Sequence, residues 1–108
     1  MENKRLKDLL AVFESRKDDP FIRYAIALEL KEEDLLQQSK EHFTELHSLF
    51  PDYVPQYFHF GKLLEQLEEQ EQAKEMYVQG IQIAEAARDW HAASEIRGAL
   101  ELLEASMF

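Results

Sequence analysis

Histidines and carboxylates are the residues of this chain that could perform acid–base or metal chemistry. The sequence holds four histidines and 22 acidic residues among 108. His42 and His47 lie five positions apart, so they diverge on a helix, and no His-Glu-x-x-His pattern occurs. No nucleophile stands beside a base, and no glycine-rich phosphate loop is present. We therefore expect no enzymatic activity, no metal and no cofactor.

The acidic residues bear on the class of partner instead. With 22 acidic against 12 basic side chains, the formal charge is −10, which disfavours nucleic acid and anionic membranes as partners. The acidic runs at 32–34 and 68–71 are typical of solvated turns rather than of paired catalytic acids. A basic or neutral protein partner fits this charge better, although acidic surface also serves solubility alone.

The chain lacks cysteine, which excludes disulfides and thiolate sites. Its start, MENKRLKDLL, is charged and does not resemble a secretory signal, and no run approaches the roughly 20 apolar residues of a membrane span. We expect a cytoplasmic protein.

Helices are predicted almost throughout, because only three glycines and three prolines interrupt the chain. A first helix over about 3–15 would place Leu6, Leu9, Leu10 and Phe13 on one side. Asp18 and Asp19 before Pro20 are a strong signal for the start of the next helix. The further helices are expected at about 20–31, 35–49, 54–67, 71–87 and 89–103.

The last of these helices should pack through one face. That face carries Trp90, Ala93, Ile96, Leu100 and Leu103. Gly98 costs about 1 kcal/mol relative to alanine inside a helix, which suggests close packing or a kink there.

Two stretches of the chain match at an offset of 34 residues. Small residues align with small ones, and bulky apolar residues mostly align with each other. The aligned pairs are Arg23 and Tyr57, Ile26 and Phe60, Ala27 and Gly61, Leu30 and Leu64, Ser39 and Ala73, and Phe43 and Tyr77. A period of this length is the signature of stacked repeats, which usually serve as binding surfaces.

The second copy, Tyr57-x2-Phe60-Gly61-x2-Leu64 followed by Ala73-x3-Tyr77, resembles the tetratricopeptide repeat, a 34-residue helix-turn-helix unit. The first copy follows the same spacing and closes with Pro51. It departs from the family pattern at Arg23 and Ala27, and the second copy departs at Glu85, but none of these residues breaks a helix.

The resemblance implies an all-α fold of about six helices, with antiparallel pairs stacked into a short right-handed α-solenoid. One domain, 1–108, would contain an N-terminal helix (3–17), two repeats (20–53 and 54–87) and a C-terminal capping helix (89–105). The residues expected to define the packing of the repeats are Ile26, Ala27, Leu30, Ser39, Phe43, Pro51, Tyr57, Phe60, Gly61, Leu64, Ala73 and Tyr77.

Function in this family usually lies on the concave face formed by the first helix of each repeat. The resemblance therefore implies a protein-interaction module that binds a peptide or helix. The expected partner-binding residues are Phe21, Tyr24, Leu28, Phe58, His59, Lys62 and Glu65. The clamp with which some relatives hold chaperone C-termini is not kept, because Tyr24, Leu28 and His59 stand at positions of its lysine and asparagines.

Two alternatives remain open for this surface. The first helix or the neighbouring repeat could cover its aromatic residues. The protein could also be a self-association module, in which the apolar face or the terminal helices pair across a twofold axis.

Overall fold

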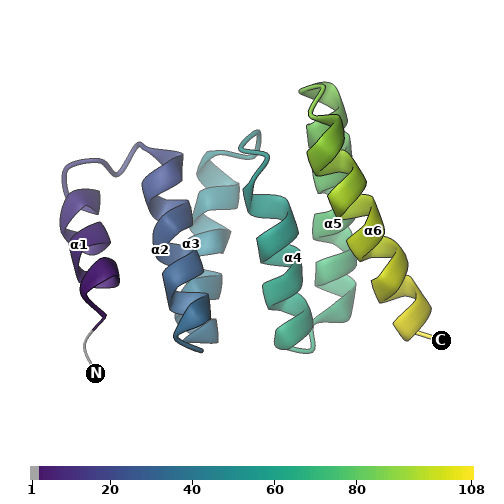
Figure 1. Ribbon diagram of the computed structural model, residues 1–108, viewed down its shortest axis with the longest axis horizontal. Coiled ribbons are helices and arrows are strands. Elements are labelled where there is room, and N and C mark those ends of the chain that lie inside the picture. The colour runs from purple at the N-terminus through teal and green to yellow at the C-terminus, as the bar shows by residue number, and fades with distance from the viewer. Residues whose placement is uncertain (1–2) are drawn as a thin grey trace. The chain divides into compact units, whose positions relative to one another are not determined.

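The computed structural model describes residues 3–108, and every regular element in them is an α-helix (Figure 1). This confirms the prediction of an all-α fold with about six helices. The helices are α1 (Lys4–Phe13), α2 (Pro20–Glu32), α3 (Leu36–Leu49), α4 (Gln56–Gln66), α5 (Gln70–Ala86) and α6 (Trp90–Ser106). No helix of the described residues is long and apolar enough to cross a lipid bilayer.

Side-chain caps begin three of the helices. Asp19 accepts a hydrogen bond of 2.9 Å from the backbone N–H of Phe21, and Pro20 occupies the first helical position, as the sequence predicts. Asn3 caps α1 in the same way through the N–H of Leu6, and Asp89 caps α6. Local sequence therefore determines where these helices begin.

Three turns between helices share one backbone geometry. Asp34, Glu68 and Arg88 adopt left-handed conformations with φ of 60–62° although none is glycine. In the turn after α2, the N–H of the residue that follows Asp34 donates a hydrogen bond to the carbonyl of the residue five positions before it. The residues that follow Glu68 and Arg88 make the same bond in the turns after α4 and α5. Asp34 and Glu68 lie 34 residues apart, so the repeat extends to the backbone of its turns.

The helices form two compact units, divided between Tyr53 and Val54. The first contains α1, α2 and α3, and the second contains α4, α5 and α6. The division falls where the 34-residue period places the boundary between its two copies.

In the first unit, α2 packs against both α3 and α1. The hydroxyl of Ser39 donates a hydrogen bond of 2.7 Å to the carbonyl of Ala27, so the backbones of α2 and α3 approach closely at two small residues. On the α1 side, Leu6, Leu9 and Phe13 pack against the apolar residues Ile22, Ile26 and Leu30 of α2. Leu10 was predicted on this side but is 42% exposed.

In the second unit, α5 packs against both α4 and α6. A Cβ added at Gly61 would lie 2.6 Å from Cζ of Tyr77, so the crossing of α4 and α5 has no room for a side chain there. A Cβ at Gly80 would lie 2.9 Å from Cγ of Tyr57 and 3.2 Å from Cδ1 of Ile96. Glycine thus lets two aromatic rings fill the spaces between helices.

The structure corrects three expectations about packing. Trp90 is 62% exposed rather than packed, and Ala99 is buried on the inner face of α6 instead. Gly98 has no atom within 4 Å of an added Cβ, so close packing does not explain it. Pro51, expected among the packing residues, is exposed in the turn after α3.

Candidate partner-binding surface

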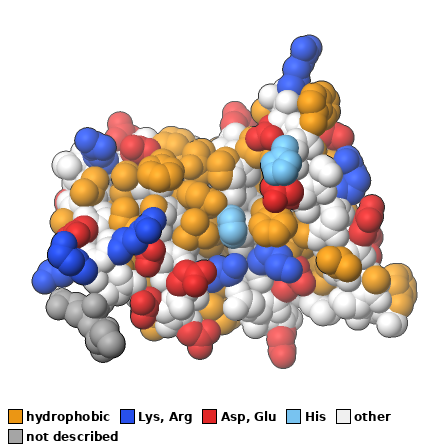
Figure 2. Space-filling view, viewed as in Figure 1, with side chains coloured by type: hydrophobic (Ala, Val, Ile, Leu, Met, Phe, Trp, Pro, Cys, Tyr) orange, Lys and Arg blue, Asp and Glu red, His pale blue; other side chains and the backbone are white. Residues whose placement is uncertain are grey.

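One side of α2 carries the first three predicted binding residues. Phe21, Tyr24 and Leu28 follow the i, i+3, i+7 spacing of a single helix face. Phe21 is 57% exposed, and the other two side chains are half-buried. This face lies on the opposite side of α2 from the residues that α1 covers, so the N-terminal helix leaves it accessible. Figure 2 shows hydrophobic side chains gathered over α2.

Tyr53, which the sequence analysis did not select, adds a third aromatic ring beside Phe21 and Tyr24 of this face. Its ring meets the ring of Tyr24 edge-on, with centroids 5.6 Å apart. Burial raises the pKa of both hydroxyls; the neighbouring Tyr53 adds to the shift of Tyr24, and the carboxylate of Asp19 adds to that of Tyr53. Both hydroxyls are therefore neutral at physiological pH and can donate hydrogen bonds.

A shallow hollow of about 340 Å³ adjoins Tyr53 at this end of the first unit. Pro20 and the segment following α3 form most of its wall. The lining residues are Pro20, Leu49, Phe50, Pro51, Asp52 and Tyr53. The hollow extends the apolar surface beyond α2 itself.

The other four predicted residues lie on α4 in the second unit. The rings of Phe58 and His59 are nearly perpendicular, with centroids 5.3 Å apart. Lys62 Nζ lies 3.9 Å from Glu65 Oε2, and the hydroxyl of Tyr77 donates a hydrogen bond to the same carboxylate. Burial, followed by this hydrogen bond, raises the pKa of Tyr77 strongly, so its hydroxyl stays protonated and holds Glu65 in place.

The histidines and acidic residues are dispersed in the structure. Among residues 3–108 no group of three or more histidine or acidic side chains is placed to hold a metal ion. His42 lies in the first unit against the ring of Phe13, whereas His91 pairs with Glu95 on the surface of α6 at 3.5 Å. These two histidines therefore lie on different helices of different units.

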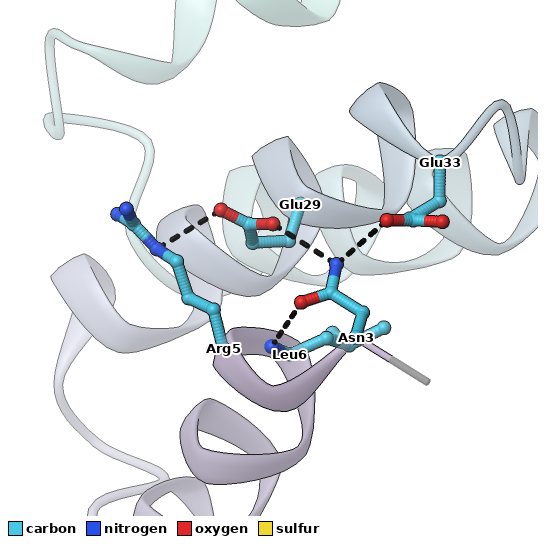
Figure 3. A network of polar contacts seen from close by, with 5 residues as sticks. All are labelled: Asn3, Arg5, Leu6, Glu29 and Glu33. Carbon is cyan, nitrogen blue, oxygen red and sulfur yellow. Dashed lines mark hydrogen bonds and ion pairs between the residues drawn. The ribbon is translucent and has the colours of Figure 1, made fainter. Parts of the chain in front are cut away.

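A polar network between α1 and α2 was also missed by the sequence analysis (Figure 3). The amide of Asn3 donates to Glu29 at 3.2 Å and to Glu33 at 2.9 Å, while Arg5 Nε lies 2.9 Å from Glu29. An asparagine immediately before a helix is an N-cap signal, but its partners lie 26 and 30 residues away and leave no local pattern.

No family model and no curated protein matches the sequence. Among solved structures, the solution structure of a tetratricopeptide repeat domain protein from Salinibacter ruber is 38% identical, covers 81% of this chain and 88% of its own, and superposes with a TM-score of 0.78. A crystal structure of a tetratricopeptide repeat domain protein from the same organism gives 38% identity, 80% and 97% coverage, and a TM-score of 0.77. This chain belongs to the tetratricopeptide repeat family.

More distant solved structures share the fold alone with this chain. PcrH, in complex with the chaperone-binding region of PopD, has 15% identity, 95% and 78% coverage, and a TM-score of 0.87. A protein from Bordetella parapertussis has 18% identity, 98% and 91% coverage, and a TM-score of 0.83. The predicted family and fold class are therefore confirmed, and the chain is a helical repeat of the kind that serves in protein interaction.

Proposed function

We propose that this tetratricopeptide repeat protein is a non-enzymatic adaptor that binds a peptide or helix of a partner protein. Residues 20–53 and 54–87 would be its two repeats, with α1 and α6 as terminal caps. The proposed contacts are Phe21, Tyr24 and Leu28 on α2 and Phe58, His59, Lys62 and Glu65 on α4. We also propose that it acts in the cytoplasm.

The exposed aromatic face of α2 is the observation that carries this proposal. Phe21 is 57% exposed beside two half-buried apolar residues and a hollow, which is more apolar surface than a solvated helix face needs. PcrH binds a region of PopD on the same type of fold, which supports a polypeptide as the ligand.

The side chains of the proposed surface indicate which kind of partner segment it would bind. Aromatic rings favour apolar anchor residues, and the hydroxyl of Tyr53 can donate to a backbone carbonyl. The net charge of −10 favours a basic or neutral partner over an acidic one.

The test is affinity capture from an extract with two double variants. Phe58→Ala/Lys62→Glu alters the proposed surface, and Val78→Ala/Lys74→Glu makes the same kind of change on α5. A protein that the wild type and the α5 variant capture, but the α4 variant does not, should then bind the purified wild type directly. Equal capture by all three chains would contradict the assignment of this surface, provided that circular dichroism shows equal helicity.

Self-association is a second candidate, because large apolar side chains remain exposed on and beside α6. Trp90 is 62% exposed, Leu102 is 74% exposed, and Phe108 is fully exposed. Two copies that pair through these residues would sediment as a dimer at high protein concentration. A single species of 12.7 kDa at every concentration would exclude this candidate.

A further inference from the structure

The face of α2 that α1 covers is a second surface, separate from the proposed partner-binding residues. It consists of the apolar residues Ile22, Ile26 and Leu30 and the acidic residues Glu29 and Glu33. Ile26 is fully buried, and Leu30 is 4% exposed. This face therefore needs an occupant, and α1 is the occupant that the structure shows.

The contacts of α1 describe what this face recognises. At one end, Asn3 and Arg5 meet the carboxylates of Glu29 and Glu33 (Figure 3). In the middle, Leu6 and Leu9 provide apolar contact. The matching ligand is thus a short amphipathic helix with a polar and basic start and apolar residues at i, i+3 and i+7.

At the other end of the site, Arg23 and His42 contact the aromatic ring of Phe13. The guanidinium of Arg23 lies 4.6 Å from the ring centroid of Phe13, and the ring of His42 meets Phe13 edge-on at 6.3 Å. A cation and a ring edge both favour an aromatic residue at this position of the bound helix.

Charge separates α1 from the remainder of the chain. Residues 3–17 hold five basic and two acidic side chains, whereas residues 18–108 hold seven basic and 19 acidic side chains. A basic helix is therefore attracted to α2, whether it belongs to this chain or to another.

The helix α1 is incompletely packed against the rest of the first unit. None of its residues is fully buried, and α1 packs mainly against α2, with Phe13 also meeting the ring of His42 on α3. A hollow of about 480 Å³ lies beside Leu9, Val12 and Ile22, with Val12 itself 39% exposed. A helix with a larger apolar side chain at the position of Val12 would bury more surface than α1 does.

We propose that this face of α2 is a binding site for a basic amphipathic helix of a partner protein, and that α1 is its built-in competitor. Covalent linkage gives α1 a high effective concentration, so a partner gains access in proportion to the fraction of chains in which α1 is undocked. A partner could therefore bind this face only when α1 is undocked, whereas binding at the exposed aromatic face would not require this change.

The test uses the full-length chain and two fluorescent peptides. One peptide has the sequence of residues 3–17, and the other carries Val12→Phe in that sequence. In the chain, Asn3→Ala/Arg5→Ala removes the polar attachment of α1 but keeps its apolar contacts. Glu14→Ala/Lys17→Ala is the matched control, because it removes only a 3.7 Å ion pair beyond the end of α1.

The Asn3→Ala/Arg5→Ala chain should bind the peptides at least about tenfold more tightly than the wild type or the control chain. Adding Glu29→Gln/Glu33→Gln should weaken that binding at least about tenfold, and the Val12→Phe peptide should bind most tightly. Circular dichroism checks that each chain keeps its helices.

Equal binding of the peptides to the wild-type and Asn3→Ala/Arg5→Ala chains would contradict the proposal that α1 competes for this face. If the peptides bind neither chain, the proposal that this face of α2 binds a helix is wrong. A dimer of the Asn3→Ala/Arg5→Ala chain alone in sedimentation would assign the site to α1 of a second copy and overturn the partner helix. Glu29→Gln/Glu33→Gln should leave capture through Phe58 and Lys62 unchanged, so failure here is distinguishable from failure of the adaptor function.

Discussion

At the scale of residues, Gly61 and Gly98 should respond in opposite ways to an added side chain. Gly61→Leu would force atoms into the ring of Tyr77, so we expect a loss of roughly 1–3 kcal/mol or more in the free energy of unfolding. Gly98→Ala meets open space and should stabilise by about 1 kcal/mol through helix propensity. Urea denaturation measures both, and a neutral Gly61→Leu would contradict the packing of α4 on α5.

His42 should make stability depend on pH. Burial and then the charge of Arg23 lower its pKa from 6.5, against a smaller opposing effect of Glu41. The unfolded chain therefore binds this proton more tightly, so the stabilisation is complete above pH 6.5 and is lost as the pH falls through the folded-state pKa.

We expect the free energy of unfolding to fall between about pH 7 and pH 5 more steeply in the wild type than in His42→Gln. His91→Gln is the control, because it removes a histidine that is exposed on α6 instead of the half-buried His42. Denaturation at several pH values measures the slopes. Parallel profiles for all three chains would show that His42 does not carry the effect.

At the scale of elements, replacing a non-glycine residue in one of the left-handed turns by glycine should stabilise the protein. A non-glycine residue in this conformation is strained by about 1–2 kcal/mol, and aspartate tolerates it better than glutamate or arginine. Glu68→Gly should therefore stabilise by about 0.5–1 kcal/mol after its extra unfolded-state entropy is included.

The matched control for that turn is Glu75→Gly, which places glycine at an exposed position inside α5. It should destabilise by about 1 kcal/mol, because there the helical conformation gains nothing from glycine. The midpoints of thermal and urea unfolding should shift upward for Glu68→Gly and downward for Glu75→Gly. Destabilisation by both would argue against the turn geometry at Glu68.

At the scale of the whole molecule, the charge of −10 should oppose folding through repulsion between acidic side chains. Raising NaCl from about 0.1 M to about 1 M shortens the screening length from about 10 Å to about 3 Å, so the midpoint of urea unfolding should rise. Glu71→Gln/Glu75→Gln removes two negative charges and should reduce this response. A midpoint that falls with salt would show that attractive ion pairs dominate instead.

The candidate surface could be predicted only in part from the sequence. The spacing of Phe21, Tyr24 and Leu28 identifies one helix face because helical periodicity is local. Tyr53 could not be assigned to it, since it follows a different helix and meets Tyr24 only after the first unit folds. The interaction of Glu65 with Tyr77, 12 residues away, likewise depends on how α4 packs against α5.

The sequence by itself determined six helices, the capped start of α2, the 34-residue period and the small residues at helix crossings, because propensity, capping and periodicity act over a few residues. Only the tertiary structure decided which face each terminal helix buries. On α6 it buried Ala99 and left Trp90 exposed, and on α1 it joined Asn3 to Glu29 and Glu33. Such choices depend on the area and charge of a partner helix distant in the chain, and no local pattern contains them.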